Sequence, residues 1–270
     1  MKRIGICTVA KNENAYINEW VSYHIRLGFN HIWIYDNNDI DKPNIIDSIS
    51  NDFKDYVTII DMKGKNLGHI PNVAAYNDFL KNYSTQIEWC AFIDVDEFVD
   101  CNANFSLDDW LASIPEYVRF VRLYWRIYGD NNIIEGDETQ PIRERFLEFV
   151  DIPRFRCIYK TFMRCNDVSN VMCGSAHRFH LREDGIEAGL LPPYYDCDFN
   201  DNDCDWNKIK NLPIRLNHYM TKSLSEFLKY KMNRVSDDYG VSNDRINYYF
   251  MINERTQEKE DYINEHIENM

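Results

Sequence analysis

The sequence has no C-x-x-C pair, no long apolar run and a shortage of basic side chains. Its eight cysteines match neither a zinc ribbon nor a redox motif, so we expect mostly buried, reduced thiols. No segment approaches the roughly 20 apolar residues that a membrane helix needs, and residues 4–10 are too short for a signal peptide. We therefore predict a cytoplasmic protein without a transmembrane segment, and leave peripheral association with a membrane open.

The shortage of basic side chains decides which partners are excluded. Lysine and arginine number 30 against 44 aspartates and glutamates, which gives a formal net charge of −14. A field of this sign repels phosphate backbones, so we do not expect nucleic acid as a partner. Any bound diphosphate must then be held by a local cation.

The sequence has enough apolar residues for one large core, because 44% of it is hydrophobic and 14% is aromatic. Up to residue 100, short apolar runs alternate with amphipathic stretches, the pattern of strands joined by helical crossovers in a parallel sheet. The predicted strands are residues 3–10, 31–35, 57–61 and 89–93, and the predicted helices include 12–27 and 72–82. The predicted fold class is therefore α/β, with a mostly parallel sheet flanked by helices.

The second half of the chain gives weaker signals. Residues 110–114 are predicted to be helical and residues 117–124 to form a strand. A long stretch rich in charges and prolines follows, which we interpret as an irregular, substrate-side region rather than sheet core. Residues 223–237 place their apolar side chains on one helical face, so we predict C-terminal helices from there onward.

Two carboxylates, Asp94 and Asp96, follow the predicted strand at 89–93. Ligands of open α/β sheets bind beyond the carboxyl ends of the strands, and two carboxylates flanking one residue there can face one divalent cation. Such a cation would offset the charge of a diphosphate leaving group. A solvated turn is the alternative interpretation of an Asp-x-Asp tripeptide, but the apolar strand before it favours the metal.

Several segments resemble nucleotide-sugar glycosyltransferases with the GT-A fold, of the family 2-like and family 92-like groups. The segments are residues 9–39 (VAKNENAYINEWVSYHIRLGFNHIWIYDNND), 68–80 (GHIPNVAAYNDFL), 89–99 (WCAFIDVDEFV), 143–146 (RERF) and 218–227 (HYMTKSLSEF). The resemblance implies one Rossmann-like GT-A domain over residues 1–222 and a C-terminal helical segment over residues 223–270. Within the domain, residues 1–100 would bind the nucleotide-sugar and residues 101–222 the acceptor.

The resemblance implies a donor site in which Asp94 and Asp96 hold Mn²⁺ or Mg²⁺. The first expectation for the donor is a UDP-sugar, and the acceptor would be a glycan or lipid-linked glycan, as in polysaccharide or lipopolysaccharide synthesis. Many family 2 members carry two aspartates where this chain has Asp36 and Asn37, which favours the family 92-like branch and leaves the base contacts open. For Glu13, solvation of the following helix is the alternative. The implied donor contacts are Thr8, Ala10, Asn12, Glu13, Asp36, Gly68, Asn77 and Asp94.

His218 and Lys222 lie four residues apart, which would place them on one helical face. A neutral imidazole can complete a metal shell, and a lysine ammonium suits a phosphate. The similar C-terminal motif of the family implies these roles, although a lone histidine is more often a core or surface residue. His177 and His180 lack further ligands at zinc-finger spacing, so we predict no zinc and take His177 as a pocket or core residue.

The resemblance to family 2-like enzymes also implies inversion at the anomeric carbon, which requires a general base for the acceptor hydroxyl. We take Glu144 as the candidate, because Arg143 and Arg145 beside it would keep its carboxylate ionised. Asp96 would act on the side of the leaving group. A surface ion-pair cluster is the alternative for Glu144, and the other candidate bases are Asp130, Asp184 and Asp196.

Tyr124, Trp125 and Tyr128 could stack on a sugar ring, although aromatic residues grouped in this way more often form core. Two other classes of function stay open. A metal-dependent nucleotide-sugar hydrolase or nucleotidyltransferase could use the same acidic pair, and a non-catalytic nucleotide-sugar-binding protein could keep the fold.

Overall fold

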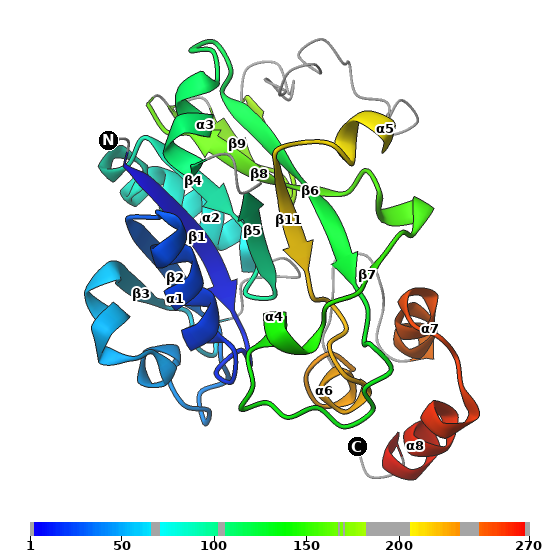
Figure 1. Ribbon diagram of the computed structural model, residues 1–270. Helices are drawn as coiled ribbons and strands as arrows, with labels where there is room; N and C mark the ends of the chain where they lie inside the picture. The colour runs from blue at the N-terminus through cyan, green and yellow to red at the C-terminus, as the bar shows by residue number, and fades with distance from the viewer. Residues whose placement is uncertain are drawn as a thin grey trace.

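The described residues form a main sheet of nine strands, flanked by helices (Figure 1). The computed structural model describes residues 3–65, 71–101, 106–166, 168–169, 171–181, 206–232 and 243–267. In their order across the sheet, the strands are β3 (Val57–Asp61), β2 (His31–Asp36), β1 (Ile4–Ala10), β4 (Trp89–Phe92), β8 (Tyr159–Arg164), β6 (Phe120–Tyr128), β11 (Ile214–His218) and β5 (Glu97–Cys101). In addition, β7 (Phe149–Val150) pairs with β6, and β9 (Val171–Cys173) pairs with β10 (Phe179–Leu181) in a separate sheet.

The direction of the strands brings several chain segments to one edge of the main sheet. β1 is parallel to β2 and β4, β2 is parallel to β3, and β6 is parallel to β11. β8 is antiparallel to both β4 and β6, so β6 and β11 point the same way as β1 to β4. β5 runs in the opposite direction beside β11. The carboxyl ends of β1, β2, β4 and β11 therefore share an edge with the first residues of β5.

Helices cover both faces of the sheet. α1 (Ile17–Leu27) and α3 (Leu107–Ser113) pack in one apolar cluster, and α2 (Pro71–Asn82) packs in another. The buried residues of α1 are Ile17, Trp20, Val21 and His24, which repeat at the spacing of an amphipathic helix. Gly28 ends this helix with a left-handed backbone (φ 118°), a conformation that glycine adopts without steric cost. The remaining short helices are α4 (Ile142–Arg145), α5 (Trp206–Ile209), and the 3₁₀ turns Ile45–Ser48, Asn51–Tyr56, Ser84–Gln86 and Pro153–Phe155.

α1 also holds the strand β5 by hydrogen bonds. The Trp20 indole donates to the carbonyl oxygen of Glu97 (2.7 Å), and the Tyr23 hydroxyl donates to that of Val99 (2.7 Å). The backbone N–H of Val99 donates to His24 Nε2 (3.2 Å). Because buried polar groups must find partners, these bonds fix where β5 begins relative to α1.

The C-terminal helices form a third apolar cluster beside the end of β6 (Figure 1). They are α6 (Leu224–Tyr230), α7 (Asn243–Ile252) and α8 (Gln257–Ile267). The buried Lys259 ammonium lies 2.6 Å from the Asp130 carboxylate, which also accepts a hydrogen bond from Tyr249. Asp130, one of the alternative candidate bases, is therefore buried within an ion pair that ties α7 and α8 to the end of β6.

The α/β class is confirmed, but the second half of the chain contains more sheet than the sequence predicted. β8 and β11 lie inside the main sheet, and β6 continues to Tyr128, beyond the predicted end at residue 124. The expectation of an irregular region outside the sheet core is therefore wrong for these two strands. Of the predicted helix at 223–237, α6 covers Leu224–Tyr230. None of the described helices is long and apolar enough to cross a membrane.

Most of the described cysteines behave as the sequence predicts. Five are free thiols, and all of these except Cys101 are buried: Cys7, Cys90, Cys101, Cys165 and Cys173. Cys157 is disulfide-bonded. The expectation of reduced thiols is therefore correct for those five and wrong for Cys157.

Candidate functional site

Asp94 lies just beyond β4, at the edge where the strand ends meet, and is held by a buried lysine. Lys160 on the neighbouring strand β8 places its Nζ 2.8 Å from Asp94 Oδ2, and the Lys160 side chain is 1% exposed. Asp94 Oδ1 accepts a long hydrogen bond from Asn72 Nδ2 (3.3 Å). Burial alone would raise the pKa of Asp94, but the Lys160 ammonium outweighs it and lowers that pKa below its usual range. Asp94 is therefore ionised, and about a third of its side chain (35%) is exposed.

Asp96 is more deeply buried than Asp94 and faces three cationic or basic side chains. Its Oδ2 forms an ion pair with Lys231 at the end of α6 and lies 4.0 Å from Lys222 Nζ. Its Oδ1 lies 3.5 Å from His218 Nε2. Burial raises the pKa of Asp96, but Lys231 and His218 outweigh it and hold the pKa well below its usual range.

His218 ends β11 and stands opposite Glu97, the first residue of β5. The imidazole lies edge-to-face on Trp125, with 4.3 Å between ring centroids. Burial lowers the pKa of His218 despite the nearby Asp96, so the ring is neutral at pH 7 and can offer a lone pair. Glu97 Oε2 accepts a hydrogen bond from the backbone N–H of Asp94 (2.8 Å), which fixes the turn between β4 and β5. Burial raises the pKa of Glu97 well above its usual range.

Lys222 joins this group from a loop and not from a helix. His218 is the last residue of β11, and Lys222 has a left-handed backbone (φ 55°) before α6 begins, so the predicted shared helical face is wrong. The Lys222 ammonium lies 4.5 Å from the centre of the Tyr16 ring. Burial lowers the pKa of Lys222, while the nearby Glu13 acts in the opposite direction. The loop after β1 and the loop after β11 therefore meet beside Asp96.

A buried network behind Lys222 holds these loops together. Glu226 receives two hydrogen bonds from Arg145 (2.7 and 2.9 Å), one from the Tyr16 hydroxyl (2.8 Å) and one from the Ser223 hydroxyl (2.6 Å). Ser223 and Glu226 also form a capping box at the start of α6. The network thus connects the loop after β1, α4 and α6 through one carboxylate.

We expect this network to stabilise the fold at neutral pH and to weaken in acid. Burial would raise the pKa of Glu226, but the hydrogen bonds from Arg145 and Ser223 outweigh it and lower the pKa from 4.5 to about 2. A carboxyl group with a lower pKa in the folded state stabilises the fold above its unfolded pKa, and this contribution fades as pH falls toward the folded pKa. A shift of this size corresponds to about 3 kcal/mol at pH 7.

Urea unfolding of the Glu226→Gln variant measures this contribution. We expect the variant to be less stable than the wild type by about 3 kcal/mol at pH 7, and by less than half of that at pH 3. A deficit that is the same at both pH values would contradict the assignment. Glu138→Gln is the control, because Glu138 forms a more exposed ion pair with Lys229 and its loss should cost less than about 1 kcal/mol.

Several predicted donor contacts have their side chains engaged with the protein itself. Both oxygens of Asp36 accept backbone N–H groups of its own loop, from Asn38 (3.1 Å) and Ile45 (2.9 Å). Asn77 bonds to both the N–H and the carbonyl oxygen of Cys173, which ties α2 to β9. Asp36 therefore fixes the loop after β2, and Asn77 holds α2 against β9.

Most of the other predicted donor contacts lie in β1 or in the loop that follows it. Asn12 has a left-handed backbone (φ 58°), and its N–H donates to Asn38 Oδ1 (2.7 Å). Thr8 is buried within β1, and its hydroxyl finds no hydrogen-bond partner in the part of the chain that is described. Ala10 ends the strand and is buried. Gly68 lies outside the described residues.

The predicted base Glu144 is exposed on α4, and its arginine neighbours bind other carboxylates. Arg143 lies 3.3 Å from Glu19, and Arg145 is bound to Glu226. Both guanidinium groups are therefore paired with carboxylates other than Glu144, and the predicted support of Glu144 by its neighbours is wrong. Asp184 and Asp196 lie outside the described residues.

Lys160, Lys231 and Glu97 were not predicted as site residues. Lys160 interrupts an apolar strand, and a lysine at such a position is a signal for a buried ion pair. Lys231 lies 135 positions from Asp96 in the sequence, and no local pattern links them. His177, predicted to be a pocket or core residue, packs edge-to-face on Trp125 with 5.5 Å between ring centroids. The side chain of His180 lies outside the described residues.

The fold is a Rossmann-like α/β arrangement, and a cluster of charged side chains lies beyond its strand ends, where ligands of open α/β sheets usually bind. The sequence model of glycosyltransferase family 92 matches residues 3–164, so the chain belongs to this family. A glycosyltransferase family 92 protein of Ricinus communis is 26% identical over 186 residues, covering 66% of this chain and 31% of that protein. Another from Oryza sativa subsp. japonica is 31% identical over 184 residues, covering 66% of this chain and 30% of that protein.

The chain therefore spans just under a third of the length of the curated relatives it matches. Among solved structures, HddC from Yersinia pseudotuberculosis is similar over 61% of this chain and 77% of HddC, with 13% identity and a TM-score of 0.32.

Proposed function

We propose that this chain transfers a sugar from a UDP-sugar to a glycan or lipid-linked glycan, with Mn²⁺ or Mg²⁺ at Asp94 and Asp96 and with inversion at the anomeric carbon. Family membership supports glycosyl transfer. The observation that carries the donor site is the pair of ionised carboxylates at the strand ends, surrounded by the ammonium groups of Lys160, Lys222 and Lys231. Inversion is proposed from the resemblance to family 2-like enzymes.

The donor atoms suit a divalent cation whose shell is completed by a diphosphate. The Oδ2 atoms of Asp94 and Asp96 face lysines, whereas among the described residues the Oδ1 atoms contact Asn72 (3.3 Å) and His218 (3.5 Å), respectively. Within the described ranges, no three His, Cys, Asp or Glu side chains are placed to hold a metal alone. Mg²⁺ is usually held by one or two carboxylates together with substrate phosphates, which fits this arrangement. When bound, the cation would supply positive charge at the leaving diphosphate.

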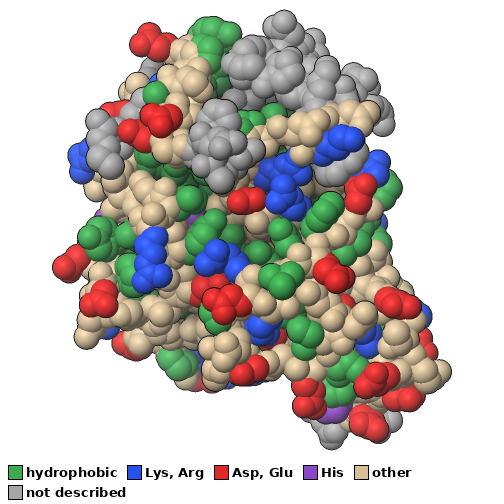
Figure 2. All heavy atoms as spheres, in the orientation of Figure 1, with side chains coloured by type: hydrophobic (Ala, Val, Ile, Leu, Met, Phe, Trp, Pro, Cys, Tyr) green, Lys and Arg blue, Asp and Glu red, His purple; other side chains and the backbone are tan. Residues whose placement is uncertain are grey.

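The lysines would act on the same diphosphate. Lys222 and Lys231 both lie beside Asp96, so a diphosphate at the metal would lie within reach of their ammonium groups. Lys160 is fully buried and holds Asp94 Oδ2, which leaves Oδ1 for the cation. On the face of the molecule shown in Figure 2, acidic side chains are scattered over the surface. The ammonium groups of Lys160, Lys222 and Lys231 therefore supply local positive charge in a chain whose formal net charge is −14.

Lys222→Met is expected to weaken UDP binding about tenfold and to change uridine binding less than twofold. The reason is that the ammonium is a point charge suited to a phosphate and has no special affinity for the base or ribose. Calorimetric titration with each ligand in the presence of Mn²⁺ measures both constants. Lys229→Met, which removes a more exposed lysine of the same helix region, is the control. Equal losses for UDP and uridine would contradict a diphosphate role.

Incubation with a panel of UDP-hexoses and UDP-N-acetylhexosamines in Mn²⁺, with p-nitrophenyl glycosides as acceptors, tests the function. A new glycoside in the mass spectrum, formed only with metal, is the expected result. UDP release without a glycoside would support the hydrolase alternative, and UDP binding without turnover would support a binding protein. Comparing the anomeric configuration of product and donor by NMR decides inversion. Glu144→Gln should abolish transfer and spare UDP binding if Glu144 is the base.

A further inference from the structure

Arg215 on β11 is a buried arginine whose charge has no partner in the part of the chain that the structure describes. Only 7% of the residue is exposed. Its Nε is fully buried without a hydrogen bond, and the guanidinium forms no ion pair with any described residue. The two terminal nitrogens also lack a hydrogen bond there, but they reach the surface. Burying a cation without a counter-ion is costly, and an arginine does not lose its proton to avoid that cost.

A second guanidinium group lies beside Arg215 on the same face of the sheet. Asn217, two residues further along β11, pairs with Arg126 on β6, and side chains two residues apart share a face of a strand. Burial, and then the charge of Arg126, lower the pKa of Arg215 from 12.5 to about 10, so Arg215 stays charged at pH 7. Asp100 stands opposite Arg215 on β5 but forms its ion pair with Arg126 (3.0 Å). Among the described residues, two guanidinium groups therefore share one carboxylate.

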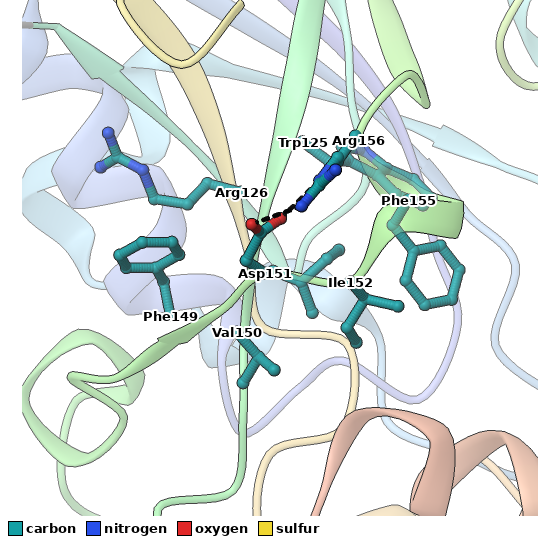
Figure 3. Close-up of a pocket in the computed structure, with 9 residues that line it drawn as sticks. Trp125, Arg126, Phe149, Val150, Asp151, Ile152, Phe155 and Arg156 are labelled. Atoms are coloured by element: carbon teal, nitrogen blue, oxygen red, sulfur yellow. Dashed lines mark hydrogen bonds and ion pairs between the residues drawn. The ribbon is translucent and has the colours of Figure 1, made fainter. Parts of the chain in front are cut away.

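The two guanidinium groups are accessible from solvent and separate from the neighbouring ion pair. On the face shown in Figure 2, Lys and Arg side chains gather over β6 and β11. The Arg126 side chain is 26% exposed, and Figure 3 shows it pointing away from Asp151 and Arg156. Those two side chains already match each other's charge through two hydrogen bonds (2.8 and 2.7 Å). The unmatched positive charge on this surface is therefore that of Arg126 and Arg215.

Two guanidinium groups side by side suit the chemistry of a phosphate group. Each guanidinium presents a planar fork of N–H donors that matches the oxygens of a phosphate, and arginine is the side chain that proteins favour for such recognition. We propose that Arg126 and Arg215 bind a phosphate group, carried either by a lipid headgroup or by a soluble molecule. The bound phosphate would supply the negative charge that the described side chains around Arg215 lack.

This phosphate would not be the donor diphosphate of the proposed function. Side chains alternate between the two faces of a strand, so Arg215 and His218 project from opposite faces of β11. His218 lies beside Asp96, at the candidate donor site. The arginine pair is therefore a second anion site, and its test requires neither UDP nor sugar transfer.

An NMR titration that follows the Nε–H signal of Arg215 tests the site directly. The protein carries isotope-labelled arginine, the signal is assigned by its absence from Arg215→Lys, and inorganic phosphate is added at constant ionic strength in EDTA. We expect a saturable shift with a Kd below about 1 mM. Arg126→Met should raise that Kd at least about tenfold, because one of the two forks is lost. Arg255→Met is the control and should change Kd less than about twofold, since Arg255 forms an exposed ion pair with Glu260.

Melting temperatures distinguish a ligand site from a purely structural arginine. Without phosphate, Arg215→Met should melt no lower than the wild type, because the substitution removes a buried cation that lacks a counter-ion. Phosphate should raise the melting temperature of the wild type and leave that of Arg215→Met unchanged. If Arg215→Met melts more than about 4 °C below the wild type without phosphate, Arg215 is paired within the fold and the proposal is overturned.

Two further measurements identify what carries the phosphate. Sedimentation with phosphatidylcholine vesicles that contain phosphatidic acid, lost in Arg215→Met, would assign a lipid headgroup. A saturable NMR shift with methyl phosphate, without sedimentation, would assign a soluble molecule. No saturable shift with inorganic phosphate, or an equal shift with chloride, would overturn the site whether or not UDP binds and sugar is transferred.

Discussion

Asp96→Asn is expected to lower kcat/KM for sugar transfer by about a hundred- to a thousandfold and to abolish the Mn²⁺-dependent part of UDP binding. Removing one preorganised electrostatic group at a site of developing charge typically costs about 3–4 kcal/mol of transition-state stabilisation. Asp96 is buried, ionised and beside both Lys222 and His218, so its charge organises the whole cluster. Initial rates with saturating acceptor, and calorimetry with UDP, measure the two effects.

Asp100→Asn is the matched control for this substitution. Asp100 lies on β5, the strand that begins directly after Asp96. It forms a partly exposed ion pair with Arg126 (3.0 Å). We expect its loss to change kcat/KM less than threefold, because the pair lies away from the Asp94–Asp96 turn and exposed pairs contribute little. Equal losses in both variants, or full activity in Asp96→Asn, would contradict the role assigned to Asp96.

Lys160→Met is expected to destabilise the fold by about 2–3 kcal/mol, less than the roughly 3–5 kcal/mol for breaking a fully buried pair, because about a third of the Asp94 side chain is exposed. The variant would leave Asp94 without its cation beside Asp96 and Glu97, so the site would gain an unbalanced negative charge. Burial alone would lower the pKa of Lys160, but Asp94 outweighs it and raises that pKa, which keeps the ammonium charged at every pH of interest. Urea denaturation at pH 7 gives the free energy of unfolding.

Lys229→Met provides the comparison, because Lys229 and Glu138 form a pair at the same 2.7–2.8 Å separation but with 57% of the lysine side chain exposed. We expect a change of less than about 1 kcal/mol there. If Lys160→Met also costs less than about 1 kcal/mol, Lys160 does not hold Asp94 in the way described. Addition of Mn²⁺ should partly restore the stability of Lys160→Met, since the cation would replace the missing positive charge.

The first half of the fold was predictable because its signals are local. Each of β1 to β4 is a short apolar run, and the helices between them follow from apolar spacing and from Gly28 or Pro71 at their ends. The position of Asp94 and Asp96 beyond the end of β4 was predictable for the same reason, since both follow an apolar strand, and their role as metal ligands stays a prediction.

The strands β8 and β11 were not predicted because buried polar residues interrupt their apolar pattern. Lys160 and Thr161 lie in the middle of β8, and both are buried there by contacts with the rest of the fold. In β11, Ile214, Leu216 and His218 alternate on the buried face, a two-residue period that was available in the sequence but includes a histidine. In both strands, contacts with distant parts of the fold bury the polar residues, and a single sequence does not show those contacts.

The partners of the acidic pair were only partly predictable. Lys222 was predicted as a phosphate ligand on a helix. In the structure it lies in the loop after β11 with a left-handed backbone, which brings its ammonium to Asp96. Lys160 and Lys231 lie 66 and 135 positions away from the carboxylates they pair with. Such pairs follow from sheet order and helix packing, which no short motif records.

Calorimetric titration of UDP into the wild-type protein, with Mn²⁺ and then with excess EDTA, tests the central claim most directly. If Asp94 and Asp96 hold a cation for the donor diphosphate, we predict binding in Mn²⁺ that weakens at least tenfold in EDTA. Equal affinity in both conditions would contradict the metal site and leave Lys222 and Lys231 as the groups that bind the diphosphate. No binding in either condition would contradict UDP as the nucleotide of the donor.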